Sequence, residues 1–593
     1  MAEGSAMTEH SRTVATLWRG AVAEPREAPA YLVREGDAWK PVSWQEAATR
    51  VDELAHGLLA LGIQKGDRFA ILAPSTLDWA LLDFALLSIG AAVVPIYPTS
   101  SVSECAYILN NAEVRGIAAD DSRLDEIRSL REQLPQLAHV LGFGELDRIS
   151  LLGRQHAREH PHAVAEAAAA VSPDDLLTCI YTSGTTGPPK GCLLTNGCYF
   201  AMVEMLAGLP NFVRPGDRTV LFLPLAHNFG RLVHFTAARV GYTIAFCPDV
   251  KKLADALVAV KPHFLPSVPR VYEKLHAAVR AQLDDATGVR KWIAGWALEV
   301  GQRSSTLTRE ARRVPLLLEF QRRLADRLVF SKVRARLGGE LRFGISGGAP
   351  LAREILEFFH TFGVVILEGY GLTECTSAAI NRLDRFRFGT VGIPLSGCKV
   401  RIAEDSEILL HGENVFSGYY LNEEATREAL GDDGWLRTGD IGELDGDGFL
   451  RITDRKKDLI ATSGGKKIAP QNIEQLLQRN ALVSHVLIVG DRRPYITALI
   501  TLNEEELESW AHAHGLDGEL AALAQNPLLL EHVQRVVDEA NRELARPEQI
   551  KRFAVLPRDF TSDEGEVTPT LKLKRRICEQ HFAAEIEALY ASS

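Results

Sequence analysis

Through the first two thirds of the chain, the pattern of hydrophobic and polar positions alternates between strand-like runs and helical segments. Strand-like runs at residues 68–72 and 92–96 flank a helical pattern at 77–89. The same order of a short apolar run, a helical pattern and a second run recurs between residues 341 and 367. Strand–helix–strand units of this kind predict an α/β fold with parallel sheets covered by helices. Because ligands bind at the carboxyl ends of such strands, chemistry is expected in the loops after Ile345 and Leu367.

The pattern changes twice toward the C-terminus. Between residues 391 and 452, short strand-like runs separated by Gly and Asp turns predict a small β-barrel or meander. The acidic turn at 445–448 lacks the spacing of a calcium loop and favours a plain hairpin. After a charge run at 454–458, strand-like runs at 486–489 and 495–501 predict a separate α+β unit.

We therefore predict two domains, one spanning residues 8–454 and a smaller one spanning 455–593. The charge run between them is either a solvated linker or a hinge.

Composition narrows the class of protein. A chain of 593 residues is too long to fold around a single hydrophobic core. Its content of 46% hydrophobic and 24% charged residues is ordinary for a globular protein. A net charge of -11 argues against a nucleic-acid-binding surface. The most apolar stretch, 79–97, is interrupted by Asp83, Ser88 and Gly90, which predicts a buried helix leading into a strand and no integral membrane segment. Eight cysteines without a CxxC pair fit a reducing cytoplasm. Peripheral membrane contact and oligomeric state stay open.

The segment YTSGTTGPPKG, residues 181–191, follows a strand-like run. Its glycines let backbone amides face an anion, its hydroxyls donate hydrogen bonds and its lysine adds positive charge, which is typical of a polyphosphate cradle. It is not a Walker loop, because the glycine-to-lysine spacing differs and no Ser or Thr follows the lysine. A flexible surface turn is the alternative. The candidate phosphate-binding residues are Thr182, Ser183, Gly184, Thr185, Thr186, Gly187 and Lys190.

Four further motifs follow in order along the chain. They are SGGAP at 346–350, EGYGLTE at 368–374, GWLRTGD leading into DRKK at 434–457, and TPTLK at 568–572. With the glycine-rich segment, they resemble the adenylate-forming superfamily, which includes acyl-CoA synthetases, luciferases and the adenylation domains of peptide synthetases. The resemblance implies flavodoxin-like parallel sheets and a small β-barrel in the large domain, followed by a mobile C-terminal lid.

The resemblance also implies an ATP site. Tyr370 would cover adenine with its ring. Asp440 would accept both ribose hydroxyls, assisted by Arg455. Without the other motifs, an Asp after Gly would be interpreted as a turn former. The remaining nucleotide-loop residues implied are Gly347, Gly348, Ala349, Pro350, Gly369 and Gly371.

The resemblance further implies a set of residues that bind the metal and the phosphates and neutralise their charge. Glu374 resembles the magnesium ligand, because Mg²⁺ prefers carboxylate oxygens. Thr373 would hydrogen-bond the α-phosphate, while Lys190 and Lys572 would neutralise the charge that moves onto pyrophosphate. The register of the C-terminal lysine is open between Lys572 and Lys574, and we choose Lys572.

Two features resemble a bacterial long-chain acyl-CoA synthetase subgroup. His227, in LPLAHNFGR, corresponds to a position beside the substrate carboxylate, although a single His is often structural. The loop at 464–467 would border the coenzyme A channel through Gly464 and Gly465, after the C-terminal domain turns about a hinge at Lys457.

We therefore predict ATP- and Mg²⁺-dependent ligation of a long-chain fatty acid to coenzyme A through an acyl-adenylate. One alternative is a ligase that acts on a medium-chain or aryl acid or loads a carrier protein. Another is an inactive paralogue that serves as a binding protein, against which Lys190, Glu374, Asp440 and Lys572 are all present. The long-chain prediction rests on this resemblance alone, since a tunnel for an acyl chain resembles any apolar core.

Overall fold

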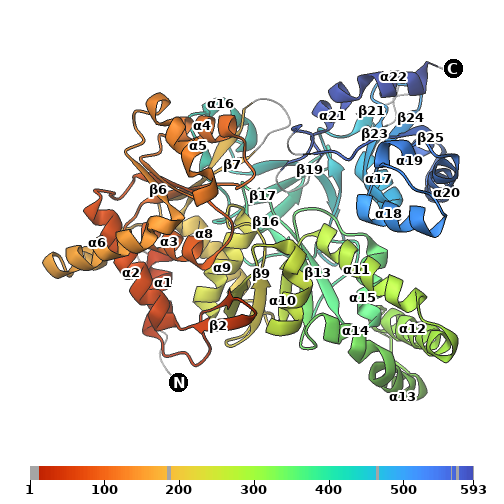
Figure 1. Ribbon diagram of the computed structural model, residues 1–593, viewed down its shortest axis with the longest axis horizontal. Helices are drawn as coiled ribbons and strands as arrows, with labels where there is room; N and C mark the ends of the chain where they lie inside the picture. The colour runs from red at the N-terminus through yellow and green to blue at the C-terminus, as the bar shows by residue number, and fades with distance from the viewer. Residues whose placement is uncertain are drawn as a thin grey trace.

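The computed structural model covers most of the chain and shows a large body with a smaller C-terminal domain against one side (Figure 1). It describes residues 12–182, 188–310, 312–461, 467–561, 564–568 and 573–591.

A mostly parallel seven-stranded sheet forms the first layer of the body. The strands β3 and β4, which pair in parallel, are those predicted from the sequence, and α3 (Leu77–Ser88) connects them. β8 and β18 add antiparallel strands at one edge. The spatial order is β18 (Gly418–Tyr419), β8 (Lys190–Thr195), β7 (Leu176–Thr182), β4 (Ala92–Ile96), β3 (Arg68–Leu72), β5 (Gly116–Ala119) and β6 (His139–Gly142).

Two further sheets complete the α/β part. The predicted second strand–helix–strand unit is β12, α15 (Arg353–Thr361) and β13, with β12 parallel to β13. Its five-stranded sheet is ordered β11 (Phe264–Ser267), β12 (Phe343–Ser346), β13 (Val365–Tyr370), β14 (Ala379–Ile380) and β15 (Ile393–Pro394). A four-stranded sheet is ordered β2 (Ala38–Val42), β1 (Tyr31–Glu35), β10 (Thr243–Phe246) and β9 (Arg218–Leu221).

The predicted small barrel is a four-stranded antiparallel half-barrel. Its strands are ordered β16 (Lys399–Ile402), β17 (Glu407–His411), β19 (Leu436–Leu444) and β20 (Leu450–Arg455). β19 and β20 pair across the acidic turn, which is therefore a hairpin as predicted. Arg387 contacts both Asp445 and Asp447 in this turn, so its acidic charge is balanced within the protein.

Helices cover the sheets and are fixed by local capping and packing. A capping box between Ser43 and Glu46 begins α2 (Trp44–Ala60). α2 packs tightly on α6 (Leu146–Glu159). Gly153 of α6 allows this close approach, since a Cβ at that position would lie 1.8 Å from the carbonyl oxygen of Glu53. The other helices of this region are α1 (Val14–Ala23), α4 (Val102–Asn111), α5 (Leu124–Ser129), α7 (Ala163–Ala169), α8 (Asn196–Ala207), α9 (Asn228–Val240) and α10 (Leu253–Val260).

A buried ion pair explains the Asp that interrupts the most apolar stretch. Asp83 of α3 accepts two hydrogen bonds from Arg231 of α9, at 2.6 and 3.1 Å, and neither side chain is exposed. A third bond from Arg231 reaches the hydroxyl of Thr178 on β7 at 2.7 Å. The pair therefore ties two helices to the central sheet, and the stretch is a buried helix and strand as predicted. None of the helices in the described part of the chain has the length and apolar character needed to span a bilayer.

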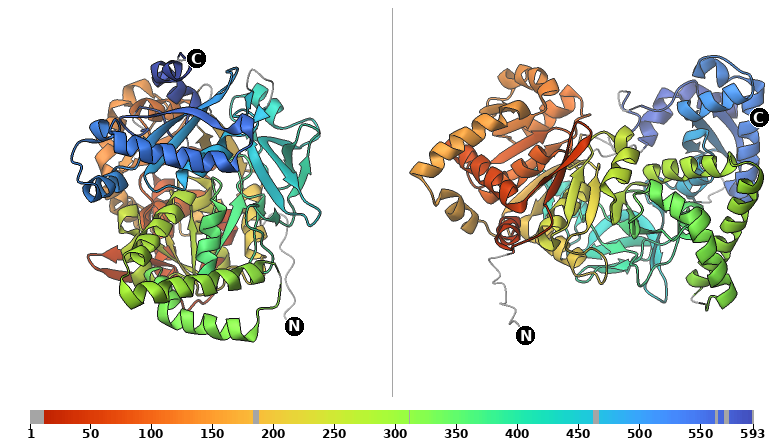
Figure 2. Two further views of the ribbon diagram at one scale, coloured as in Figure 1. Left: turned by 90° about the vertical axis from the view of Figure 1, so that its right-hand side faces the viewer. Right: turned by 60° about the horizontal axis from the view of Figure 1, so that its bottom comes forward.

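A helical arm extends from the edge of the body. It lies at the outer margin of the molecule in both further views (Figure 2). Its helices are α11 (Pro269–Asp284), α12 (Gly288–Arg309), α13 (Leu316–Ala325) and α14 (Ser331–Arg336).

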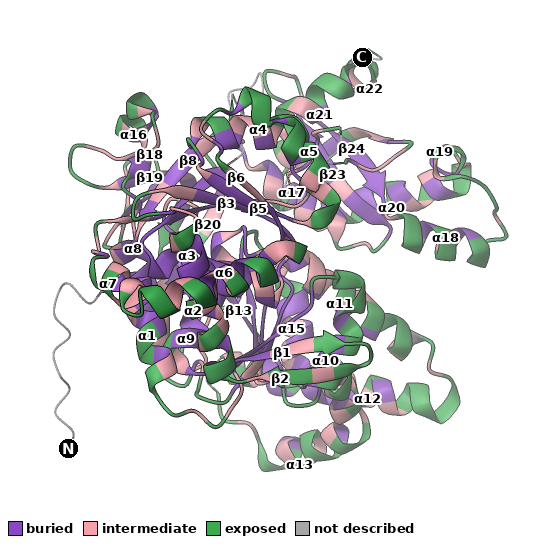
Figure 3. Ribbon diagram, turned by 60° about the vertical axis from the view of Figure 1, so that its left-hand side comes forward, coloured by how far each residue is buried: buried purple, intermediate pink, exposed green. Residues whose placement is uncertain are grey.

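The C-terminal domain has a hydrophobic core of its own, formed by residues of its helices and of its three-stranded sheet. Figure 3 shows the buried residues of β23 and β24 between exposed helix faces. The sheet is ordered β23 (Val483–Val489), β24 (Ile496–Leu502) and β25 (Ile550–Val555). Its other elements are β21 (Ile460–Ala461), β22 (Lys467–Ile468), α17 (Pro470–Gln478), α18 (Glu504–Ala513), α19 (Leu520–Leu523), α20 (Pro527–Glu543), α21 (Arg575–His581) and α22 (Ala583–Tyr590). The division predicted at residues 454 and 455 falls at the end of β20, and it stays a prediction.

Candidate active site

A cavity of about 620 Å³ opens beyond the carboxyl ends of β12 and β13. Residues from the central sheet, the half-barrel and the C-terminal domain all line it, the last through Thr568. The loops after β12 and β13, where the sequence pattern predicted chemistry, both contribute to its wall.

The cavity brings together many of the predicted site residues. Those that line it are Thr182, Lys190, His227, Gly347, Gly348, Gly369, Tyr370, Gly371, Thr373, Glu374, Asp440, Arg455 and Lys457. Ala349 and Pro350 are described but are not among the lining residues. The predicted positions that lie outside the described residues are Ser183, Gly184, Thr185, Thr186, Gly187, Gly464, Gly465 and Lys572.

Glu374 and Lys190 contact different parts of one tyrosine, the hydroxyl and the ring. The hydroxyl of Tyr419 donates to Glu374 Oε1 at 2.6 Å, and Lys190 Nζ lies 5.2 Å from the centre of the Tyr419 ring. β18 carries Tyr419 beside β8, which begins at Lys190. Burial and the Glu374 carboxylate both raise the pKa of Tyr419, so its hydroxyl remains a donor. A carboxylate and an ammonium are thereby held at one wall of the cavity.

Asp440 is held from two sides. Tyr370 Oη donates to its Oδ2 at 2.6 Å, and Arg455 Nε lies 3.2 Å from its Oδ1. Asp440 and Arg455 are direct partners in the antiparallel register of β19 and β20. Burial, reinforced by the Asp440 charge, raises the pKa of Tyr370 well above its usual value, so the phenol stays protonated. The carboxylate is oriented before any ligand arrives.

The two glycine-containing loops have conformations that side chains would disturb. Gly348 has φ +87°, in the left-handed region, and a Cβ on Gly371 would lie 1.9 Å from the carbonyl oxygen of Thr376. Glu368 connects the loops, since its Oε1 accepts a hydrogen bond from the Leu351 amide at 3.2 Å. Burial raises the pKa of Glu368 to about 7, against the opposing effect of this backbone bond.

His227 occupies the N-cap of α9. Its Nδ1 accepts a hydrogen bond from the Phe229 amide at 3.1 Å. In the neutral ring the proton is then on Nε2, which acts as a donor. The next residue, Asn228, donates to the carbonyl oxygen of Thr373 at 3.0 Å, which joins the start of α9 to the loop after β13. The histidine thus has a capping role as well as a place in the cavity wall.

The cavity has an apolar part formed by α8, α9 and neighbouring strands. Leu232, Val233 and Thr236 present one face of α9 to it. The other residues of this part are Leu206, Phe212, Val213, Tyr242, Phe264 and Ile345. An apolar extension beside a charged region can hold a ligand with one anionic end and one hydrocarbon end.

The hinge candidate lies in the turn that follows β20. Lys457 lines the cavity, and its neighbour Lys456 pairs with Asp405 at 2.6 Å and with Glu407 at 2.9 Å. These pairs fix the half-barrel side of the connection. Lys574, the alternative to Lys572, donates its backbone N–H to the carbonyl oxygen of Glu566 and is not among the lining residues.

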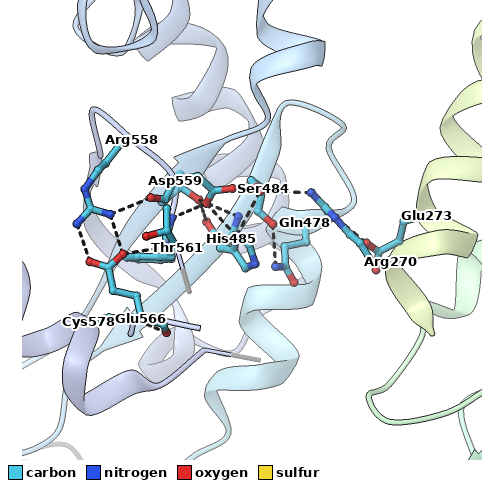
Figure 4. A network of polar contacts seen from close by, with 12 residues as sticks. Arg270, Glu273, Gln478, Ser484, His485, Arg558, Asp559, Thr561, Glu566 and Cys578 are labelled. Atoms are coloured by element: carbon cyan, nitrogen blue, oxygen red, sulfur yellow. Dashed lines mark hydrogen bonds and ion pairs between the residues drawn. The ribbon is translucent and has the colours of Figure 1, made fainter. Parts of the chain in front are cut away.

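Polar contacts hold the C-terminal domain against the arm (Figure 4). Arg270 of α11 donates to the hydroxyl of Ser484 on β23 at 3.3 Å. Ser484 in turn donates to Asp559 at 2.5 Å. Burial would raise the pKa of Asp559, but hydrogen bonds from His485, Ser484 and Thr501 together lower it to about 2.

The preceding residue, Arg558, continues this network toward Thr568. Arg558 makes two bonds of 2.7 Å to Glu566, two residues before Thr568. His581 Nδ1 lies 2.9 Å from the same carboxylate. Side chains therefore connect the segment that docks the domain to Glu566, near Thr568.

Several residues of the site were not predicted from the sequence. A Tyr, an Asn or an Arg alone carries no signal, so Tyr419, Asn228 and Arg270 could be recognised only after distant segments had been brought together. The pairs of Lys456 were missed for the same reason, although its charge run was noted.

Two protein-family models match the chain. The first, "AMP-binding enzyme", matches residues 17–420, and the second, "AMP-binding enzyme C-terminal domain", matches residues 457–593. The long-chain-fatty-acid–CoA ligase FadD15 of Mycobacterium bovis is 39% identical over 98% of this chain and 97% of its own length. Long-chain-fatty-acid–CoA ligase 5 of Rattus norvegicus is 30% identical over 98% of this chain and 89% of its own.

Solved structures share the fold at low sequence identity. The adenylation domain of a Mycobacterium chelonae carboxylate reductase has a TM-score of 0.76 at 22% identity, covering 100% of this chain and 92% of its own. The anthranilate CoA ligase AuaEII, in complex with anthranoyl-AMP, has a TM-score of 0.73 at 20% identity, covering 98% and 100%. A Mycobacterium tuberculosis fatty acyl CoA synthetase has a TM-score of 0.63 at 22% identity, covering 98% and 100%.

Proposed function

Because the chain belongs to the AMP-binding enzyme family, we propose that it ligates a long-chain fatty acid to coenzyme A. ATP is consumed, an acyl-adenylate is the intermediate, and AMP and pyrophosphate are released. The observation that carries the proposal is the cavity, in which Lys190, Glu374 and Asp440 lie at a polar end that continues into an apolar part. The identity of 39% to a long-chain-fatty-acid–CoA ligase over 98% of the chain supports the choice of acid.

The first half-reaction joins two anions. The acid's carboxylate oxygen forms a bond to the α-phosphorus of ATP, and the bond from that phosphorus to pyrophosphate breaks. Lys190 and Lys572 offset the charge that moves onto the leaving pyrophosphate, and Thr373 hydrogen-bonds the α-phosphate. His227 orients the carboxylate by donating from Nε2, since its Nδ1 is engaged by Phe229.

The residues present fit magnesium carried by the nucleotide. Glu374 supplies the hard carboxylate oxygen that Mg²⁺ prefers, and Lys190, over the ring of the same Tyr419, supplies positive charge for phosphate oxygens. When bound, the ion would draw charge from the phosphate oxygens and so favour departure of pyrophosphate. Tyr419 holds the Glu374 carboxylate in place through its 2.6 Å hydrogen bond.

The nucleoside would be oriented by the half-barrel. Asp440 accepts the ribose hydroxyls with a carboxylate already positioned by Tyr370 and Arg455. The remainder of the Tyr370 ring would cover the adenine, and Gly347, Gly348, Gly369 and Gly371 in the cavity wall would allow close approach of the nucleotide.

In the second half-reaction the thiol of coenzyme A attacks the carbonyl carbon of the acyl-adenylate. The bond from that carbon to the AMP oxygen breaks, and the thiol proton is released. We assign the pantetheine channel to the loop containing Gly464 and Gly465, and the pivot that brings this loop to the cavity to Lys457. The turn position of Lys457 after β20 supports a pivot there, because a turn absorbs backbone rotation more readily than a strand.

One assay tests the function and its alternatives. AMP formation is measured with fatty acids of two to twenty carbons, benzoate and amino acids, each with and without coenzyme A. We expect the highest kcat/KM above about twelve carbons, because each buried methylene adds about 0.8 kcal/mol of transfer free energy. A preference for benzoate or an amino acid would refute the acid assignment. Turnover with a carrier protein but not with coenzyme A would refute the acceptor, and no AMP from any acid would indicate an inactive paralogue.

We also propose a cytoplasmic location. The eight cysteines are all free thiols and all buried, which suits a reducing compartment.

A further inference from the structure

An apolar stripe runs along the outward face of the helical arm. Leu316 is 90% exposed and Phe320 67% exposed, and they are followed at the same spacing of four by Leu324 and Leu328. Leu317 is 70% exposed beside them. Residues four apart share one face of a helix, so these five side chains form one continuous strip along α13 and the turn after it. We call it the α13 stripe.

Packing of the arm does not need this stripe. Leu318, Ala325 and Phe330 on the opposite face are buried and join the main core. Single exposed apolar residues are common on protein surfaces, but five on one helix face indicate an interaction site. In Figure 3 the ribbon of α13 carries exposed residues interspersed with buried and intermediate ones.

Basic residues surround the stripe. Residues 309–336 contain nine Arg or Lys and three Asp or Glu, a net charge of +6 in a chain whose total is -11. Arg323 of α13 is exposed, as are Arg313 just before the helix and Arg327 just after it. An exposed helix with leucine and phenylalanine on one side and arginine beside them has the composition of helices that lie in a membrane interface.

We propose that the α13 stripe docks this protein on an anionic lipid surface. The apolar side chains would enter the boundary between headgroups and acyl chains, while the arginines would pair with lipid phosphates. A second copy of the chain fits the stripe less well, because a symmetric contact through it would bring two segments of charge +6 together. The role is separate from ligation, and it would place the enzyme where fatty acids are dissolved.

The test is vesicle flotation of the full-length protein. Vesicles contain either equal parts phosphatidylglycerol and phosphatidylcholine or phosphatidylcholine alone. We expect binding to the anionic vesicles, weaker binding to the neutral ones, and a decrease as salt is raised. The double variant Phe320→Glu/Leu324→Glu should bind the anionic vesicles about tenfold less or worse, since it removes two large apolar groups and adds two negative charges.

Matched variants separate docking from general damage. Leu151→Glu changes an apolar residue of α6 that is 60% exposed and should leave vesicle binding unchanged. Arg313→Gln/Arg323→Gln retains the stripe and should reduce the preference for anionic over neutral vesicles. All variants should keep the melting temperature and the rate of AMP formation from octanoate without vesicles, and binding itself requires no ligase activity.

Three results would overturn the proposal. The first is absence of vesicle binding by the unchanged protein. The second is equal binding by the Phe320→Glu/Leu324→Glu variant. The third is concentration-dependent self-association in analytical ultracentrifugation that this double variant abolishes, which would assign the stripe to a second copy.

Discussion

Glu368 should make the stability of the large domain fall as the pH rises toward neutrality. Burial raises its pKa in the folded protein from 4.5 to about 7. Below pH 4.5 the carboxyl is protonated in both states. Between pH 4.5 and 7 the unfolded chain releases its proton while the folded protein keeps it, so the free energy of unfolding decreases across this window.

The size of the effect follows from the same values. At 1.36 kcal/mol per pH unit, the difference between 4.5 and about 7 corresponds to about 3 kcal/mol. Glu368→Gln keeps a neutral oxygen that can accept from the Leu351 amide and has no proton to lose. The variant should therefore gain up to about 3 kcal/mol relative to the unchanged protein between pH 5 and pH 8.

Urea unfolding followed by tryptophan fluorescence provides the measurement, because seven of the eight tryptophans precede residue 454 and report on the large domain. The control is Glu132→Gln, which neutralises an exposed glutamate. Midpoints for Glu368→Gln and the unchanged protein should separate as the pH rises. If they instead run parallel from pH 5 to pH 8, Glu368 is already ionised in the folded protein and the reasoning fails.

Three further predictions concern the reaction. Glu374→Gln should reduce kcat/KM for ATP by about a hundredfold and raise the magnesium concentration for half-maximal rate, since one charged oxygen is lost; unchanged magnesium dependence in steady-state assays would exclude this residue from the ion's site. Lys572→Ala should abolish acyl-adenylate formation while sparing thioester formation from supplied acyl-adenylate, and equal losses in single-turnover assays of both steps would refute the assignment. Arg270→Ala should slow adenylation about threefold to tenfold without affecting the second step, because it removes the contact with Ser484; slowing of both steps would contradict a role in docking.

The ends of strands were predicted best from the sequence where every residue of the strand, or nearly every one, is buried. β3 and β4 match the expected residues at both ends, because all their residues except Arg68 are apolar and the strands are covered on both faces. β12 begins two residues later than expected, at Phe343, and β23 begins three residues earlier, at Val483. The ends of such strands depend on pairing with neighbours, which a single run of residues does not encode.

Long-range pairing also limited prediction of the site. β18 has only two residues, and its Tyr419 reaches Glu374 because it pairs with β8 more than two hundred residues away. The capping role of His227 required the start of α9 to be known. The arm was not anticipated, because α13 is apolar on two faces and its pattern resembles a buried helix.

The contacts of the C-terminal domain with α15 and α11 imply sensitivity to ionic strength. Arg479 meets Glu354 of α15 at 3.0 Å with both side chains more than one third exposed, and Arg270 reaches Ser484 at 3.3 Å. An exposed pair of this kind contributes about 0–1 kcal/mol and is screened by salt. These contacts are therefore weak, which suits the movement that we propose for this domain. Added salt should shift its resting population away from the docked arrangement and slow adenylation before it slows transfer to the thiol.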